Sequence, residues 1–151
     1  MVIVSPMIEI RRFEFSDTTL FALARKIRYD VFVLGQKVPE SLEYEHEEAA
    51  VHYLLLENGE PRATARWRVT PLGIKLERFA VPSPFRNLGL GTIILERVLQ
   101  DVLPLGKPIY LHAQTTAVKY YLRAGFVTVG EEIEEAGIRH YKMVFGAEKQ
   151  Q

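Results

Sequence analysis

Residues 51–81 carry the pattern that most constrains the fold, because three short runs with strand character follow one another with only tight turns between them. The first run, Val51–Glu57, ends at Asn58-Gly59, a dipeptide typical of two-residue β-hairpin turns. The second run alternates apolar and polar residues, and Pro71-Leu72-Gly73 leads into a third run, Ile74–Val81. This stretch therefore predicts a meander of three antiparallel strands.

The alternation also predicts which side chains share a face of the sheet. In the third strand, Arg78 falls on the face of Ile74, Leu76 and Ala80, so a cation interrupts an apolar row. Either Arg78 extends to water at the sheet edge, or it is buried with a carboxylate partner, which is the interpretation we favour. The second strand is expected to place Ala63, Ala65, Trp67 and Val69 on one face and Arg62, Thr64, Arg66 and Arg68 on the other.

Outside the meander the apolar residues recur mainly at helical spacing. Ser16-Asp17 is a suitable N-cap for a helix that ends near Gly35, and Gln36–Glu48 is expected to be a loop with at most one helical turn. The other expected elements are a first strand within Met1–Glu9, helices at 90–102 and 115–124, and short strands at 109–112, 126–129 and 138–145. Helices inserted into a largely antiparallel sheet predict an α+β (mixed α/β) domain.

Length and composition limit the classes of function. A chain of 151 residues suits one domain, which we assign to residues 1–146, followed by a polar tail at 147–151. The 19 basic and 19 acidic residues cancel, which argues against bulk binding of nucleic acid or a membrane surface. The chain has no cysteine, so it cannot form a disulfide or use a thiolate. We expect a cytoplasmic protein without a metal, because the histidines show no metal-ligand spacing.

The segment Glu77–Gly91 carries the chemistry. A strand ends at Val81, a turn with two prolines follows, and Gly89 and Gly91 open a helix with Arg86 beside them. The free N–H groups and the positive end of a helix dipole form a site for phosphate. A plain turn with tight packing would explain the same glycines. The loop lacks the lysine of a nucleotide-triphosphate loop and the third glycine of a dinucleotide fingerprint.

Two segments resemble the signatures of the GNAT N-acetyltransferases. Arg86-Asn87-Leu88-Gly89-Leu90-Gly91 is similar to the family's Q/R-x-x-G-x-G/A motif, and Tyr120–Phe126 is similar to its F/Y-Y-x-x-x-G-F segment. The resemblance covers nearly the whole chain. It implies the GNAT fold, in which a mixed, mostly antiparallel sheet has a splayed central parallel pair and about four flanking helices.

The resemblance also implies a co-substrate and the residues that bind it. In the family, acetyl-CoA lies between the two splayed strands, and its pyrophosphate takes N–H groups from the glycine-rich loop. The residues at matching positions are Phe79, Ala80, Val81, Arg86, Asn87, Leu88, Gly89, Leu90, Gly91 and Thr92. The implied reaction is direct transfer of the acetyl group to a primary amine of a small molecule or peptide, in a ternary complex.

Three residues are candidates for proton transfer. Tyr121 occupies the position of the family's general acid, although a core tyrosine on the same helix face would look alike. Glu77 is the first candidate for general base. The alternative interpretation is that Glu77 is an ordinary exposed glutamate of a strand. His112 is the second candidate, because histidines titrate near neutrality. The alternative interpretation is that His112 is a core histidine bonded to a backbone carbonyl.

A narrower resemblance to the ElaA/YjcF-like subgroup rests on four segments: Arg28-Tyr29-Asp30-Val31-Phe32-Val33, His52, Leu111-His112-Ala113-Gln114 and Gly137-Ile138-Arg139-His140. The first of them also resembles acyl-homoserine-lactone synthases. Acylation of a specialised acceptor and a non-catalytic acyl-CoA sensor therefore stay open as alternatives. Homodimers are common among such folds. The acidic run Glu43, Glu45, Glu47 and Glu48 with His46 either attracts a cationic amine or, as we expect, forms a solvated loop.

Overall fold

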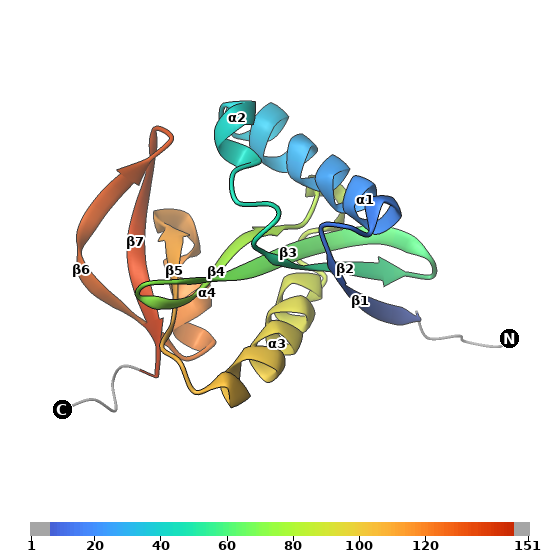
Figure 1. Ribbon diagram of the computed structural model, residues 1–151. Coiled ribbons are helices and arrows are strands. Elements are labelled where there is room, and N and C mark those ends of the chain that lie inside the picture. Colours follow the sequence, from blue (N-terminus) through green and yellow to red (C-terminus); the bar gives the residue numbers. More distant parts are fainter. Residues whose placement is uncertain (1–6, 147–151) are drawn as a thin grey trace, which may run out of the picture.

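The fold is a twisted seven-stranded sheet with helices on both faces, as a computed structural model that describes residues 7–146 shows (Figure 1). The strand order is β1-β2-β3-β4-β5-β7-β6. Every neighbouring pair is antiparallel except β4 and β5. This is the GNAT acyl-CoA N-acyltransferase fold, with the central parallel pair that the resemblance implies.

The strands are β1 (Ile8–Glu14), β2 (Val51–Glu57), β3 (Glu60–Thr70), β4 (Gly73–Ala80), β5 (Ile109–Gln114), β6 (Phe126–Glu135) and β7 (Ile138–Phe145). The predicted meander is confirmed as β2–β4, and its first turn has positive φ at both Asn58 and Gly59, as a type I′ hairpin requires. The first strand differs from the prediction, because it begins at Ile8 and runs to Glu14. The earlier part of the predicted strand and the tail 147–151 lie outside the described residues.

The helices are α1 (Thr18–Arg28), α2 (Glu40–Glu43), α3 (Leu90–Val102) and α4 (Val118–Arg123). Asp17 caps α1 by accepting a hydrogen bond from the Leu20 N–H at 3.1 Å. After Arg28 the helical path continues as a π-helix, Tyr29–Gly35, which explains why the periodic pattern reaches Gly35. None of the helices among residues 7–146 is long and apolar enough to cross a membrane.

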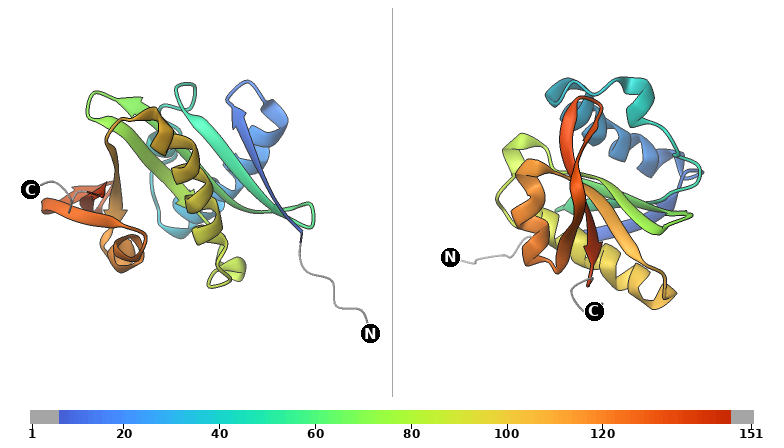
Figure 2. Two further views of the ribbon diagram at one scale, coloured as in Figure 1. Left: turned by 90° about the horizontal axis from the view of Figure 1, so that it is seen from below. Right: turned by 90° about the vertical axis from the view of Figure 1, so that its left-hand side faces the viewer.

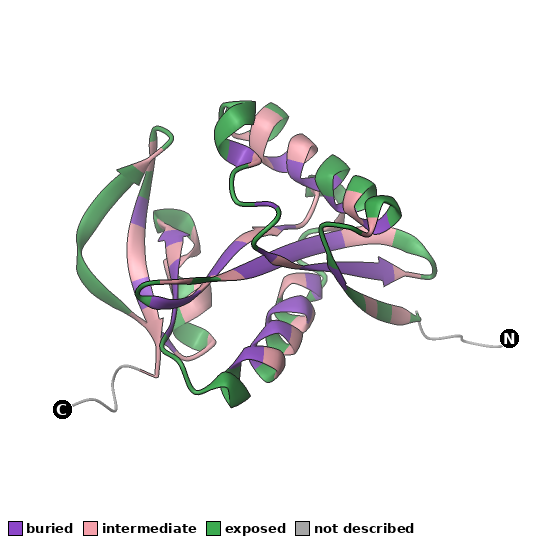
Figure 3. Ribbon diagram, in the orientation of Figure 1, coloured by how far each residue is buried: buried purple, intermediate pink, exposed green. Residues whose placement is uncertain are grey.

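Two apolar layers hold the helices to the sheet. Helix α3 packs on one face, where Ile94, Leu95 and Val98 are buried against side chains from β2–β5. Helix α1 covers the other face with Leu20, Ala24 and Ile27. The right-hand view of Figure 2 shows the two helices on opposite sides of the strands. The buried stripe along both helices and the central strands is visible in Figure 3.

The hairpin of β6 and β7 stands apart from the rest of the sheet (Figure 1). It joins the sheet through the β5–β7 pair alone, and β6 extends to Glu135 rather than ending at Val129 as predicted. An irregularity in the register between Val129 and Ile133 accompanies this length. The hairpin therefore forms a wall beside the centre of the sheet.

Candidate active site

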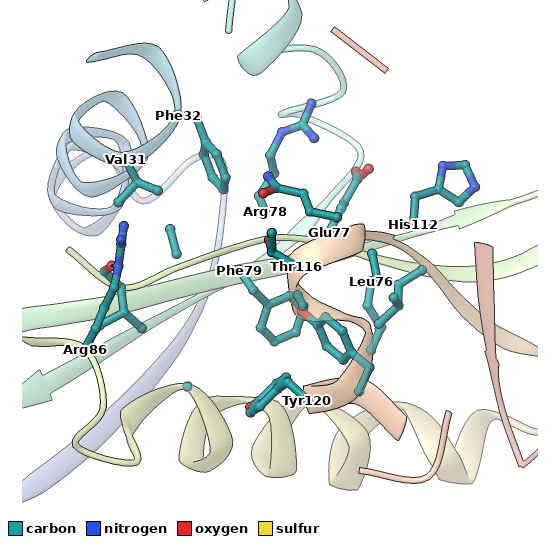
Figure 4. A pocket seen from close by; sticks show the side chains of 18 of the residues that line it. Val31, Phe32, Leu76, Glu77, Arg78, Phe79, Arg86, His112, Thr116 and Tyr120 are labelled. Atoms are coloured by element: carbon teal, nitrogen blue, oxygen red, sulfur yellow. The ribbon is translucent and has the colours of Figure 1, made fainter. Parts of the chain in front are cut away.

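The parallel strands β4 and β5 pair over three residues only and then separate. Ile74–Leu76 pair with Ile109–Leu111, whereas β4 continues to Ala80 and β5 to Gln114. A cavity of about 780 Å³ occupies the gap, and both strands, the start of α3 and helix α4 line it (Figure 4). The splay is therefore the feature that opens a binding site in the centre of the sheet.

A glycine-rich turn delivers the N-terminus of α3 to this cavity. Gly89 is the N-cap of α3 with φ of +83°, a backbone conformation that side chains with a Cβ rarely adopt. No side chain caps the first N–H groups of the helix, so they are free to bind an anion. Nine of the ten predicted cofactor residues line the cavity, and Leu88, whose side chain is exposed, does not.

Arg86 lies across the same turn. Its Nε donates a hydrogen bond of 2.7 Å to the carbonyl oxygen of Val81. The bond joins the end of β4 to the turn before α3, and the side chain stays exposed at the cavity edge. The guanidinium is therefore positioned beside the helix N-terminus, where it adds a positive charge to the anion site.

A β-bulge changes the direction in which the side chain of Arg78 points. Thr64 pairs with Ala80 and Arg66 with Glu77, so Arg78 and Phe79 together lie opposite Ala65 alone. Arg78 has φ of +60°, and the predicted row of Ile74, Leu76, Arg78 and Ala80 on one face is therefore wrong. The bulge leaves backbone polar groups of β4 outside the ladder at the wall of the cavity.

The side chain of Arg78 is paired, as we favoured from the sequence. Its Nε lies 3.4 Å from Glu43 Oε2 and donates to the Glu43 carbonyl at 3.2 Å, and its Nη2 donates to the Leu42 carbonyl at 3.1 Å. The bulge thereby connects β4 with α2. Figure 4 shows the Arg78 side chain directed away from Phe79, which points towards α3.

Glu77 is buried among cations. Its Oε1 accepts hydrogen bonds from Arg66 Nε at 3.1 Å and Arg68 Nε at 2.7 Å, and its Oε2 lies 3.6 Å from Lys75 Nζ. Burial disfavours the charged form of the carboxyl, but the cations, Arg66 above all, outweigh it and lower the pKa of Glu77. A carboxylate held in this way stays ionised and takes up a proton less readily than an ordinary glutamate.

His112 lies across the splay from Glu77 and is paired with a residue from β6. Its Nδ1 is 3.0 Å from Glu135 Oε2, and the hydrogen bond from His112 lowers the pKa of Glu135 to about 2. An ionised carboxylate only accepts hydrogen bonds, so Nδ1 carries the proton in the neutral ring. The Nε2 lone pair is then the basic atom of His112, on a side chain that lines the cavity.

Tyr120 and Tyr121 come from α4, and both line the cavity. Their rings meet edge to face at 5.0 Å between centroids, and Tyr121 packs in the same way on Phe126. Burial raises the pKa of both hydroxyls. The Tyr120 hydroxyl is buried and makes no hydrogen bond of ordinary length and angle with the described residues. The Thr92 side chain lies near enough to lower its pKa, but by less than burial raises it. A Cβ placed on Gly91 would lie 3.6 Å from that hydroxyl oxygen, so this unsatisfied group faces the start of α3.

Comparisons with known proteins agree with this geometry. The acetyltransferase (GNAT) domain family matches residues 17–146. The chain belongs to the GNAT acetyltransferase family. A relative in Bacillus subtilis, named as the uncharacterized N-acetyltransferase YjcF, is 34% identical over 78% of this chain and 86% of its own length.

Two solved structures share the fold of this GNAT domain along most of the chain. An acyl-CoA N-acyltransferase from Pseudomonas aeruginosa superposes with a TM-score of 0.79 at 30% identity, covering 92% of this chain and 99% of the other. Escherichia coli ElaA superposes with a TM-score of 0.80 at 28% identity, with the same coverage of both chains. The resemblance to the ElaA/YjcF-like subgroup is therefore confirmed.

The acidic run of this GNAT domain is only partly solvated, so the expected solvated loop is wrong for two of its members. Glu43 and Glu47 are buried, because Glu43 Oε1 accepts from Arg28 Nε at 2.8 Å and Glu47 bridges Arg28 and Arg66. These pairs have no direct signal in the sequence, since the arginines lie on α1 and β3, far along the chain from the acidic run.

Proposed function

We propose that this GNAT domain transfers the acetyl group of acetyl-CoA to a primary amine of a small molecule or peptide. The observation that carries the proposal is the cavity between the parted strands, which ends at the glycine-capped N-terminus of α3. The name of the Pseudomonas aeruginosa relative, an acyl-CoA N-acyltransferase, supports an acyl-CoA co-substrate. Acetyl-CoA supplies an activated acyl thioester when it is bound.

The residues of the cavity fit this co-substrate at three places. The N–H groups from Leu88 to Thr92 and the guanidinium of Arg86 suit the pyrophosphate, because both concentrate positive charge on one side. The backbone of β4 near Phe79 and Val81 suits the pantetheine arm and the acyl carbonyl. A backbone N–H aimed at that carbonyl oxygen would stabilise the negative charge that develops there.

The unsatisfied hydroxyl of Tyr120 is a further contact that the sequence motifs do not reveal. A buried polar group without a partner is costly, and binding a ligand with a hydrogen-bonding group removes that cost. Since the hydroxyl faces Gly91, we assign Tyr120 to the binding of the phosphate or pantetheine portion of acetyl-CoA. Gly91 keeps this approach open because it has no side chain.

Proton transfer requires a base for the amine and an acid for the thiolate. An alkylamine is mostly protonated near neutral pH, so a proton has to be removed before attack. We propose that His112 Nε2 accepts this proton while Glu135 holds the ring. Glu77 is the second candidate and lies at the same level of the splay, but its lowered pKa makes it the weaker base. It is suited to orienting a water molecule between amine and histidine.

Tyr121 is the proposed general acid. It lines the cavity from α4, whereas the base candidates lie on β4 and β5, and its raised pKa keeps the hydroxyl protonated at neutral pH. A protonated tyrosine can transfer its proton to the departing thiolate of CoA. The two proton-transfer groups thus come from different elements that line one cavity.

The test is release of free CoA thiol from acetyl-CoA in the presence of a panel of primary amines. We expect amine-dependent thiol release, with the acetylated amine identified by mass spectrometry. Thiol release should fall about 100-fold or more in Tyr121→Phe, because removing a general acid typically costs that much. Tight binding of acetyl-CoA without turnover of any amine would contradict the proposed enzymatic activity. It would favour the alternative function as a non-catalytic acyl-CoA sensor.

A further inference from the structure

A second cavity of about 300 Å³ adjoins the acyl-CoA cleft. The two cavities share a boundary formed by Lys75, Glu77, Gln114 and Glu135, among other residues. The π-helix after α1 and the loop before β2 cover one side of the smaller cavity, and the β6–β7 hairpin covers the other. A molecule in the smaller cavity would therefore reach the point where β4 and β5 separate.

The floor of this cavity contains cations whose hydrogen-bonding capacity is not used up. Lys75 Nζ lies 3.6 Å from Glu77 Oε2, too far for a hydrogen bond, and this carboxylate already accepts bonds from Arg66 and Arg68. Arg68 bonds Glu77 through Nε, and its side chain is 18% exposed, against 15% for Lys75. The two residues therefore have donors left for an anionic group of a ligand.

The other charged groups around the cavity are already paired or lie at its rim. Arg78 and Glu43 are paired with each other, whereas Glu45 and His46 are exposed. His140 donates from Nδ1 to the Ile138 carbonyl at 2.8 Å. Glu135 carries a negative charge and holds His112, so the part of the cavity beside this pair attracts an ammonium group.

The backbone positions that carry the two ends are separated by about the length of a small zwitterion. Lys75 pairs with Tyr110 in the parallel ladder, and His112 follows two residues later on the same face of β5. Two residues along a strand span about 7 Å. An amine and a carboxylate on the same or adjacent carbon atoms, each with one hydrogen bond of about 3 Å, bridge this span.

We propose that the acceptor is a free amino acid, with its amino group at His112 and Glu135 and its carboxylate at Lys75 and Arg68. This inference rests on the proposed acetyl transfer and names the class of its acceptor. In the reaction, His112 accepts one proton from the ammonium group, the amine nitrogen forms a bond to the acyl carbon, and the thioester C–S bond breaks. The thiolate leaves as a thiol with the proton of Tyr121, and the second proton lost by the nitrogen replaces it. The carboxylate takes no part in the chemistry and only orients the amine.

The test compares amino acids with their decarboxylated amines as acceptors: L-phenylalanine with phenethylamine, L-histidine with histamine and L-lysine with cadaverine. We expect kcat/KM to be at least tenfold higher for the amino acid in at least one pair, since a charge-assisted hydrogen bond is lost on decarboxylation. In Lys75→Met the preference should disappear through a higher KM, with acetyl-CoA affinity unchanged. Lys75→Arg should restore most of it.

Lys142→Met is the matched control, because Lys142 contacts the Tyr110 ring at 5.3 Å but lines neither cavity. A Lys75→Met enzyme that behaves like Lys142→Met would overturn the inference, as would equal turnover of amino acids and decarboxylated amines. Neither of these results affects the proposed acetyl transfer. Failure of every compound to accept an acetyl group would overturn both.

Discussion

Glu77 on β4 and His112 on β5 lie at the same level on the two sides of the splay, each directly after the last paired residue of its strand. Their environments differ. Glu77 is surrounded by arginines that keep it ionised, whereas His112 is held by one carboxylate on the β6–β7 hairpin. The point where the strands separate therefore carries a fixed charge on one strand and a basic nitrogen on the other, and both residues line the cavity.

The pairing of His112 with Glu135 predicts a defined tautomer. In the neutral ring, Nδ1 should carry the proton, whereas His52, whose Nε2 donates to the Glu47 carbonyl at 3.0 Å, should carry it on Nε2. Nitrogen-15 spectra of histidine-labelled protein distinguish the two forms. Glu135→Ala should shift His112 towards the Nε2–H form and leave His52 unchanged. An Nε2-protonated His112 in the wild-type chain would rule out Nε2 as the base.

Tyr120 and Tyr121 should respond differently to the loss of their hydroxyls. Tyr120→Phe removes a buried group without a partner, so the free energy of unfolding should stay the same or rise by about 1 kcal/mol. The same change should weaken acetyl-CoA binding about tenfold. Tyr121→Phe should leave acetyl-CoA affinity intact and lower kcat. Equal effects of the two variants on both quantities would show that the assigned roles are wrong.

The buried ion pairs should make Glu47 important for stability. Glu47 bridges Arg28 and Arg66, and both guanidinium groups are almost fully buried. Glu47→Gln removes one of the two carboxylates that each buried guanidinium contacts, leaving Glu43 for Arg28 and Glu77 for Arg66, and should lower the free energy of unfolding by about 3 kcal/mol. The exposed neighbour Glu48 provides the control. Glu48→Gln should change the free energy of unfolding by less than about 0.5 kcal/mol. Urea denaturation measures both, and similar midpoints for the two variants would contradict the network.

The lowered pKa of Glu135 predicts a pH dependence of stability. A carboxyl whose pKa falls from 4.5 to about 2 on folding stabilises the folded chain above pH 4.5, and this contribution is lost as the pH falls towards 2. Glu135→Gln should therefore flatten the decline of unfolding free energy between these values. The exposed Glu134→Gln serves as the comparison. If both variants follow the wild-type curve, the ion pair contributes nothing to folding.

Much of the fold could be predicted from the sequence, because local periodicity determined it. The bounds of β2 and β7 and of α3 coincide with the predicted ones, since each has an apolar pattern bounded by turn residues. The bulge at Arg78 could not be predicted, because an inserted residue leaves no mark in an alternating pattern until the partner strand is known. The ion pairs that join Glu47 to Arg28 on α1 and Arg66 on β3 were also missed, because their members lie far apart in the sequence.

The site was partly predictable. The glycine-rich motif indicated the anion site at α3, and His112 was already a candidate, but Glu135 was not, because β6 was expected to end at Val129. Only the long, separate hairpin brings Glu135 to β5. Tyr120 was not a candidate, because the motif identifies Tyr121 as the functional tyrosine. The burial of the Tyr120 hydroxyl without a hydrogen bond could be seen only in the folded chain.

The most direct test of the central claim is a calorimetric titration of acetyl-CoA into the wild-type protein and two glycine variants. Gly89 and Gly106 both have positive φ and open space at the Cβ position, but only Gly89 caps α3 at the cleft. Gly89→Glu and Gly106→Glu should thus cost similar stability, about 1–2 kcal/mol. We predict micromolar binding that persists in Gly106→Glu and is lost in Gly89→Glu. No binding to the wild-type protein, or equal binding by both variants, would contradict an acyl-CoA site at the N-terminus of α3.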